Sequence, residues 1–144
     1  MLFRSQALLQ DYFEYRLVAM EALLGAVGPS GRERLIGYWQ QWLDSQCDEC
    51  TEQKCLVVKL AAEVADLSDA MRLTLRDGTD RVIARIARVI DDGIADDSLP
   101  ALDALPVAQT LYQLWLGASL IGKLHRNRKS LENAMDFTMK LLSP

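Results

Sequence analysis

The sequence has few of the residues that build active sites and metal centres. Its 144 residues include one histidine, His125, and three cysteines. No short motif supplies a general base, and carboxylates such as Glu63 and Asp66 have no evident partner in the sequence. We therefore predict a protein that is not an enzyme and needs no cofactor.

The sequence also lacks an excess of positive charge and any long hydrophobic run. Lys and Arg number 16 against 20 Asp and Glu, a net charge of −4, whereas nucleic-acid-binding domains usually carry a basic face. The most apolar stretch, residues 110–124, is shorter than the ~20 residues of a membrane helix and is interrupted by Gln113 and Lys123. The N-terminus becomes charged too early for a secretory signal. These features predict a cytoplasmic protein that does not enter a membrane.

Hydrophobic spacing predicts a single all-α domain over residues 1–144, because apolar residues recur at helical intervals and no strand-like alternation persists. The first helix is expected over residues 5–26. Ser30 and Glu33 have the spacing of a capping box and predict the start of the second. Further helix starts are expected near Cys55, at Asp66 or Ser68, and near Pro106 and Ser130, with the longest break at residues 91–106. About six helices with short connections predict a bundle.

All three cysteines lie within nine positions, at Cys47, Cys50 and Cys55. A structural zinc site needs four ligands, usually as two close pairs, and no second pair exists in the sequence. A redox C-x-x-C normally accompanies a βαβ unit, which an all-α chain does not have. A structural disulfide fits poorly with the reducing cytoplasm. We therefore predict no metal site at these cysteines.

Cys55 differs from the other two because it lies where a polar segment ends and an apolar helix is expected to begin. The N-terminus of a helix stabilises negative charge, and Lys54 and Lys59 are close in sequence. These groups would favour the thiolate, which is the reactive form. Lys123, beside a patch of small residues, is a second candidate cation. The alternative interpretation, that Cys55 is a small core residue, remains open.

Two further sets of residues are candidates for binding. Five aromatic residues from two expected helices either line a pocket for an organic ligand or form part of the core: Tyr38, Trp39, Trp42, Tyr112 and Trp115. The last two expected helices carry small and apolar residues that either pair with a second copy of the chain or pack internally: Leu114, Gly117, Ala118, Ile121, Leu131, Met135 and Thr138.

Four segments resemble the C-terminal domain of TetR-family transcriptional regulators: "RLIGYWQQWLDSQC", "KCLVVKLAAEVADLSDAMR", "GTDRVIARIARVI" and "LYQLWLGASLIGKL". The resemblance extends over residues 8–142. The closest subgroup is the electrophile-responsive repressors of the N-ethylmaleimide-reductase-repressor type. The resemblance implies a helical regulatory domain that dimerises through its last two helices and binds an effector. It also implies that Cys55, which opens the "CL-V-K" block, is the sensing thiol and that Lys123 is its charged neighbour.

The family's helix-turn-helix, which precedes this domain, has no counterpart in the sequence. We therefore expect that DNA is bound only through such a domain and that this chain does not recognise an operator by itself. The leading hypothesis is a homodimeric regulatory domain that senses electrophiles or oxidants through Cys55. Two alternatives keep the fold: a hydrophobic effector bound reversibly among the aromatic residues, and a domain that only dimerises.

Overall fold

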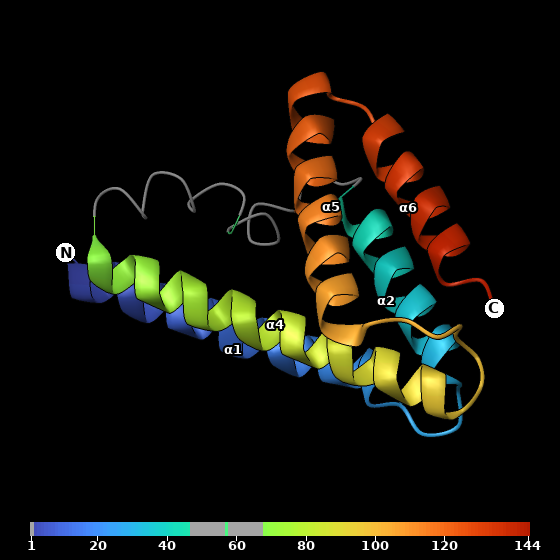
Figure 1. Ribbon diagram of the computed structural model, residues 1–144. Coiled ribbons are helices and arrows are strands. Elements are labelled where there is room, and N and C mark those ends of the chain that lie inside the picture. The colour runs from blue at the N-terminus through green and yellow to red at the C-terminus, as the bar shows by residue number, and fades with distance from the viewer. Residues whose placement is uncertain (1, 47–56, 58–67) are drawn as a thin grey trace.

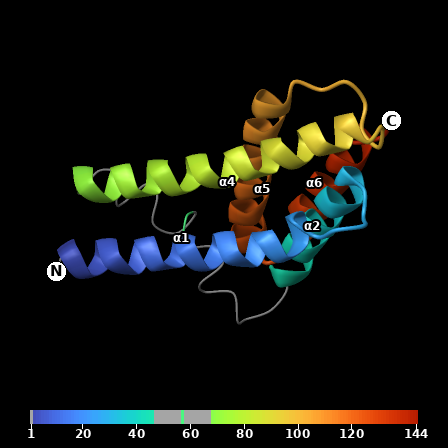
Figure 2. The same ribbon diagram turned by 90° about the horizontal axis from the view of Figure 1, so that it is seen from below.

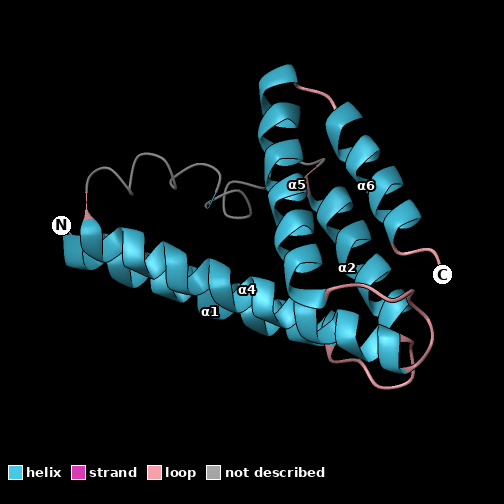
Figure 3. Cartoon of the chain, viewed as in Figure 1, coloured by secondary structure: helices cyan, strands magenta, loops and turns pink. Residues whose placement is uncertain are grey.

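The computed structural model describes residues 2–46, 57 and 68–144, and this part of the chain is helical with no strand. Its helices are α1 (Leu2–Leu24), α2 (Gly31–Ser45), α4 (Asp69–Ala95), α5 (Ala104–His125) and α6 (Lys129–Leu141) (Figures 1 and 3). The predicted all-α class is therefore confirmed. The helix expected from Cys55 onward lies outside the described residues except for Val57, which is helical and buried.

The long helices α1 and α4 lie side by side and run in the same direction (Figures 1 and 2). Arg81 donates to Glu14 at 3.0 Å, and Arg85 donates to both carboxylate oxygens of Glu21 at 2.7 and 2.8 Å. The hydrogen bonds from Arg85 lower the pKa of Glu21. Both pairs are exposed on the Glu side, so they contribute little stability, and the buried apolar stripes hold the two helices together.

Helices α2, α5 and α6 form a second group that crosses the C-terminal halves of α1 and α4 (Figure 1). Helix α5 packs on α4 and α6, and α2 packs on α1, α4 and α6. Leu17, which helical spacing also places on the apolar stripe of α1, is only partly buried, but the other apolar residues expected on the stripes of α1 and α4 are buried. They comprise Leu9, Phe13, Met20 and Leu24 of α1 and Met71, Leu75, Val82, Ile86 and Val89 of α4.

Local sequence explains where most of these helices begin. The hydroxyl of Ser30 accepts from the amide of Glu33 at 3.1 Å, and the hydroxyl of Ser68 accepts from the amide of Met71 at 3.3 Å. Both serines therefore satisfy amides that have no partner inside the helix. The two starts confirm the predicted cap at Ser30 and decide for Ser68 over Asp66.

The prediction that Ser130 caps the last helix is wrong. Its hydroxyl instead donates to the carbonyl of Ala118 at 2.7 Å and joins α6 to α5. The side chain of Asn127 accepts from the amide of Lys129 at 3.1 Å. Helix α6 therefore begins at Lys129, one residue before the predicted cap.

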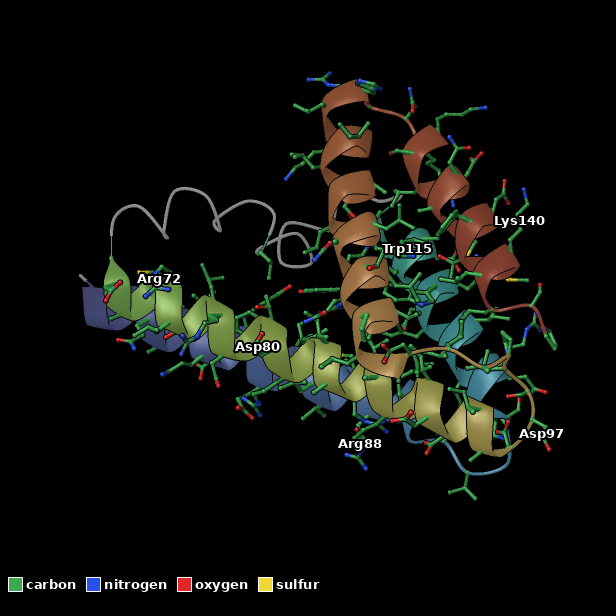
Figure 4. All side chains as sticks on the ribbon, in the orientation of Figure 1. Arg72, Asp80, Arg88, Asp97, Trp115 and Lys140 are labelled. Atoms are coloured by element: carbon green, nitrogen blue, oxygen red, sulfur yellow. The ribbon has the colours of Figure 1, made fainter. Side chains whose placement is uncertain are left out.

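The predicted break at residues 91–106 is also too long, because α4 continues to Ala95 and α5 starts at Ala104. The turn that follows α4, residues 96–98, caps the N-terminus of α2. The carboxylate of Asp96 accepts from the amide of Gly31 at 2.8 Å, and the hydroxyl of Ser98 accepts from the amide of Arg32 at 3.1 Å. Figure 4 shows the neighbouring Asp97 at the outer edge of this turn. The turn thereby fixes the start of α2 against the end of α4.

Candidate functional site

The five aromatic residues predicted to cluster do come together, between α2 and α5. The rings of Trp39 and Trp115 stack with centroids 5.1 Å apart and an interplanar angle of 13°. Trp42 lies 6.0 Å from Trp115 and 6.1 Å from Tyr112, and Tyr38 packs edge-on against Trp39 at 4.8 Å. Such offset and edge-to-face contacts add to the stability that burial of the rings gives.

Two polar contacts fix the indoles of this cluster. Nε1 of Trp42 donates to the hydroxyl of Ser119 at 2.9 Å, which ties α2 to α5. Nε1 of Trp115 donates to the hydroxyl of Thr138 at 3.0 Å, which ties α5 to α6. Figure 4 shows Trp115 on α5 at the side where α2 and α6 pack. Both hydrogen bonds are buried, so rotating either indole would leave its N–H without a partner, and each ring is held in one orientation.

Only part of the aromatic cluster faces open space. Trp39 and Trp115 have no exposed surface and belong to the core. Trp42 and Tyr112 line a narrow inner hollow of about 10 Å³ together with Val57. Tyr38 and Trp42 line a groove of about 100 Å³ between α1 and α2, which is partly open to solvent. The groove and the hollow meet at Trp42 and at a residue that the sequence analysis did not select, Arg16.

Arg16 is the charged residue of this site. The carbon of its guanidinium group lies 5.7 Å from the centroid of the Trp42 ring, which fits a cation–π contact. None of the ion pairs within residues 2–46 and 68–144 includes Arg16. The signal in the sequence is its place on α1, three residues after Phe13 and four before Met20, both of which are buried. An arginine at that spacing must lie at the edge of the apolar stripe.

Two buried polar atoms near this charge have no hydrogen-bond partner in the described part of the chain: Oη of Tyr38 and Nε1 of Trp39. Burial raises the pKa of Tyr38 to about 12, and the positive charge of Arg16 acts in the opposite direction. Burial also raises the pKa of Tyr112. Both phenols are therefore neutral at pH 7. The Tyr38 hydroxyl lies close enough to Arg16 for its oxygen to accept from the guanidinium, but it donates to no acceptor among the described residues.

The candidate sensing residues are not placed together by the structure. Cys55 lies outside the described residues, as do Cys47 and Cys50. Lys123 is exposed near the C-terminal end of α5. Val57, two positions after Cys55, is 7% exposed and lines the inner hollow. Among the described residues, no three His, Cys, Asp or Glu side chains are grouped so that they could hold a metal ion.

Three of the residues predicted to face a partner are instead buried within the single chain. Ala118, Leu131 and Thr138 pack α5 against α6 and have almost no surface left for another molecule. This assignment is corrected for these three. Gly117 and Ile121 are exposed, and Leu114 and Met135 are partly buried. Helical spacing could not separate the two sets, because an apolar stripe looks the same whether it faces a neighbouring helix or a second copy.

The exposed apolar residues near Ile121 were missed by the sequence analysis. They are Leu120, Leu124 and Phe137. They lie on the same two helices, α5 and α6, as Gly117 and Ile121. No helix among the described residues is both long enough and apolar enough to cross a membrane.

Comparisons with known proteins agree on one family. Residues 31–138 match the family described as the tetracyclin repressor-like C-terminal domain. The chain is 36% identical over 135 residues to the HTH-type transcriptional repressor NemR from two Escherichia coli strains, covering 93% of this chain and 67% of NemR.

Solved structures give the same result. The fold matches the reduced form of E. coli NemR with a TM-score of 0.88 and 34% identity, covering 96% of this chain and 72% of that one. It matches a transcriptional regulator of the TetR/AcrR family with a TM-score of 0.83 and 37% identity, covering 95% of this chain and 71% of that one. The members of this family are regulators and not enzymes. The chain therefore belongs to the tetracyclin repressor-like C-terminal domain family and is similar over nearly its whole length to the repressor NemR.

Proposed function

We propose that this domain is the effector-sensing and dimerising part of a TetR-type repressor in the cytoplasm, and that Cys55 is its sensing thiol. The observation that carries the proposal is the likeness to NemR, a repressor whose solved form is described as reduced. Within the sequence, Lys54 precedes Cys55 and Lys59 follows it, and nearby cations favour the thiolate. The −4 net charge supports DNA binding through a separate helix-turn-helix domain and not through this one.

The proposed chemistry is addition of the Cys55 thiolate to an electrophile. With a maleimide, the sulfur forms a bond to one alkene carbon, the carbon–carbon π bond breaks, and the other carbon takes a proton from water. Val57, two residues on, lies beside Trp42 and Tyr112 in the inner hollow. A bulky group on Cys55 would therefore perturb packing close to α1 and α5, and a packed core changes between discrete arrangements rather than bending smoothly.

The test is to find which cysteine reacts first. The chain is treated with less than one equivalent of N-ethylmaleimide, and the adduct is located by peptide mass spectrometry. We expect the first adduct on Cys55 and slower labelling of that residue in Lys123→Met. Lys129→Met, another exposed lysine on the same pair of helices, is the matched control and leaves the rate unchanged. Faster labelling of Cys47 or Cys50 would contradict the proposal.

Dimerisation is proposed through the exposed apolar side chains of α5 and α6, centred on Ile121, Leu124 and Phe137. Burying this face between two copies removes apolar surface from water, which favours association. Ile121→Glu places a charge in the interface, so we expect a monomer in analytical ultracentrifugation. Val18→Glu is the control, since Val18 is 72% exposed on α1, and it leaves the dimer intact. A dimer that survives Ile121→Glu would place the interface elsewhere.

A second candidate function is reversible binding of an organic effector among the aromatic residues. The observation that favours it is the unpartnered hydroxyl of Tyr38 in a wall of the groove between α1 and α2. This function does not require Cys55. It predicts that Cys55→Ser abolishes covalent labelling but leaves effector binding intact.

A further inference from the structure

The groove between α1 and α2 combines apolar and aromatic side chains with a few polar groups, which is the composition of a small-molecule site. Its cavity volume of about 100 Å³ is smaller than the ~300–1,000 Å³ of pockets that enclose drug-sized ligands, so it suits a small ligand that stays partly exposed to solvent. One wall comes from α1 and the other from α2, and the lining residues are Tyr15, Arg16, Ala19, Met20, Leu23, Tyr38, Gln41, Trp42 and Ser45. Most of this lining is apolar or aromatic. None of these lining residues, which all belong to the described part of the chain, is a carboxylate.

Among the described residues, the polar groups of this groove include two strong donors and no negative charge. The guanidinium of Arg16 always carries a positive charge, and no described carboxylate forms an ion pair with it. The Tyr38 side chain is 4% exposed, and its hydroxyl has no partner in the described part of the chain. The guanidinium of Arg16 lies within hydrogen-bonding reach of the Tyr38 phenol, so two donors lie side by side with no acceptor among the described residues. A buried hydroxyl that donates to nothing is costly, and this pair of donors points to an acceptor that is supplied by a ligand.

The apolar surface beside these donors includes the indole of Trp42 and aliphatic side chains of α1. Arg16 stacks over the ring of Trp42, which holds the guanidinium at the edge of the groove. Met20 and Trp42 are both largely buried and extend the apolar wall. A ligand that satisfies all of these groups has a planar hydrophobic body and one anionic oxygen group.

We propose that this groove binds small aromatic carboxylates, with the carboxylate between Arg16 and the hydroxyl of Tyr38 and the ring against Trp42. The inference rests on the second proposed function, reversible effector binding, and adds the charge class of the effector. Because Arg16 belongs to α1 and Tyr38 to α2, the bound carboxylate joins the two helices. Organic cations are excluded because they meet the charge of Arg16.

The test compares 2-naphthoate with its neutral analogue 2-naphthamide, using calorimetry and quenching of tryptophan fluorescence on the full chain. We expect 2-naphthoate to bind at least tenfold more tightly than 2-naphthamide. Arg16→Met raises the Kd for 2-naphthoate at least tenfold and leaves that for 2-naphthamide unchanged. Arg76→Met, an exposed arginine of α4, is the matched control and changes neither Kd.

Tyr38→Phe separates ligand binding from folding. This variant removes a buried hydroxyl that donates to no acceptor within the described residues, so the fold is kept and its thermal stability is unchanged or higher, while the Kd for 2-naphthoate rises at least threefold. Equal binding of the naphthoate and the naphthamide would overturn the charge class but leave a neutral effector pocket. Binding of neither would overturn both the inference and the second function, and the Cys55 proposal would remain to be decided by labelling.

Discussion

Replacing Thr138 by Val tests the buried contact that joins α5 to α6. The two side chains have nearly the same shape, but valine cannot accept the hydrogen bond that Nε1 of Trp115 donates at 3.0 Å. Both residues have 0% exposure, so no water reaches the indole in the folded chain. Leaving a buried donor unsatisfied costs about 1–3 kcal/mol.

Two smaller effects adjust this figure. The hydroxyl of Thr138 also donates to the carbonyl of Ala134 at 2.7 Å, but that carbonyl keeps its ordinary helical acceptor role. The methyl group of valine adds apolar burial that offsets up to ~0.8 kcal/mol. We therefore expect Thr138→Val to lower the free energy of unfolding by about 1–2 kcal/mol.

The assay is urea unfolding, followed by circular dichroism at one fixed protein concentration because a dimer's stability depends on concentration. Thr110→Val makes the same chemical change at an exposed position of α5, where substitutions usually change stability by less than about 0.5 kcal/mol. If the two variants lose equal stability, or if Thr138→Val is as stable as the parent, the reasoning about the indole is refuted.

Three further predictions follow from the packing and the pKa values. Since burial raises the folded-state pKa of Tyr38 to about 12 and the unfolded value is about 10, its contribution to stability is complete below pH 10 and is lost between about pH 10 and 12. The free energy of unfolding of Tyr38→Phe should therefore fall less between pH 10 and 12 than that of the parent, whereas Tyr15→Phe, at an exposed site, should behave like the parent. An equal effect of the two variants would contradict the raised pKa of Tyr38. Hydrogen bonds from Ser98 and from the amide of Gly31 lower the pKa of Asp96, so its contribution is present above the unfolded value of about 4 and is lost as the pH falls through the lower folded value. The free energy of unfolding of Asp96→Ala should therefore fall less as the pH is lowered than that of the parent. An unchanged dependence on pH would show that the Asp96 cap does not stabilise the fold. Gly31→Ala should prevent folding or strongly destabilise the folded chain, because a Cβ at this position meets the backbone of Gly93. Gly37→Ala, whose Cβ would have nothing within 4 Å, should instead raise the free energy of unfolding by up to about 1 kcal/mol. Thermal melting compares the two variants, and similar melting temperatures would contradict the close packing of Gly31 on Gly93.

The sequence could predict the features that depend on the spacing of residues within a single helix. The buried positions of α1 and α4 follow from apolar residues three and four apart, and the start of α2 follows from Ser30 and Glu33. The aromatic cluster was predictable because Trp39 and Trp42 lie on one helix and Tyr112 and Trp115 on another, each pair three residues apart and therefore on one face.

The features that it could not predict depend on which helices meet. Ser130 has the chemistry of a cap, but α5 places the carbonyl of Ala118 within its reach. Leu131 and Thr138 have the pattern of an interface, but they are covered by the chain's own helices. The role of Arg16 depends on its position over Trp42, a residue of another helix. In each case the role of the residue depends on a contact with another helix, and the neighbouring sequence does not show which helices meet.

The most direct test of the central claim is the pH dependence of alkylation at each cysteine of the unmodified chain. Iodoacetamide labelling rates at Cys47, Cys50 and Cys55 are measured separately by mass spectrometry between pH 5 and pH 10. The account predicts that Cys55 is the fastest of the three at pH 7 and reaches half its maximal rate below ~8.5, the pKa of a free cysteine. A half-maximal rate at or above that value, or slower labelling than at Cys47 and Cys50, would contradict it.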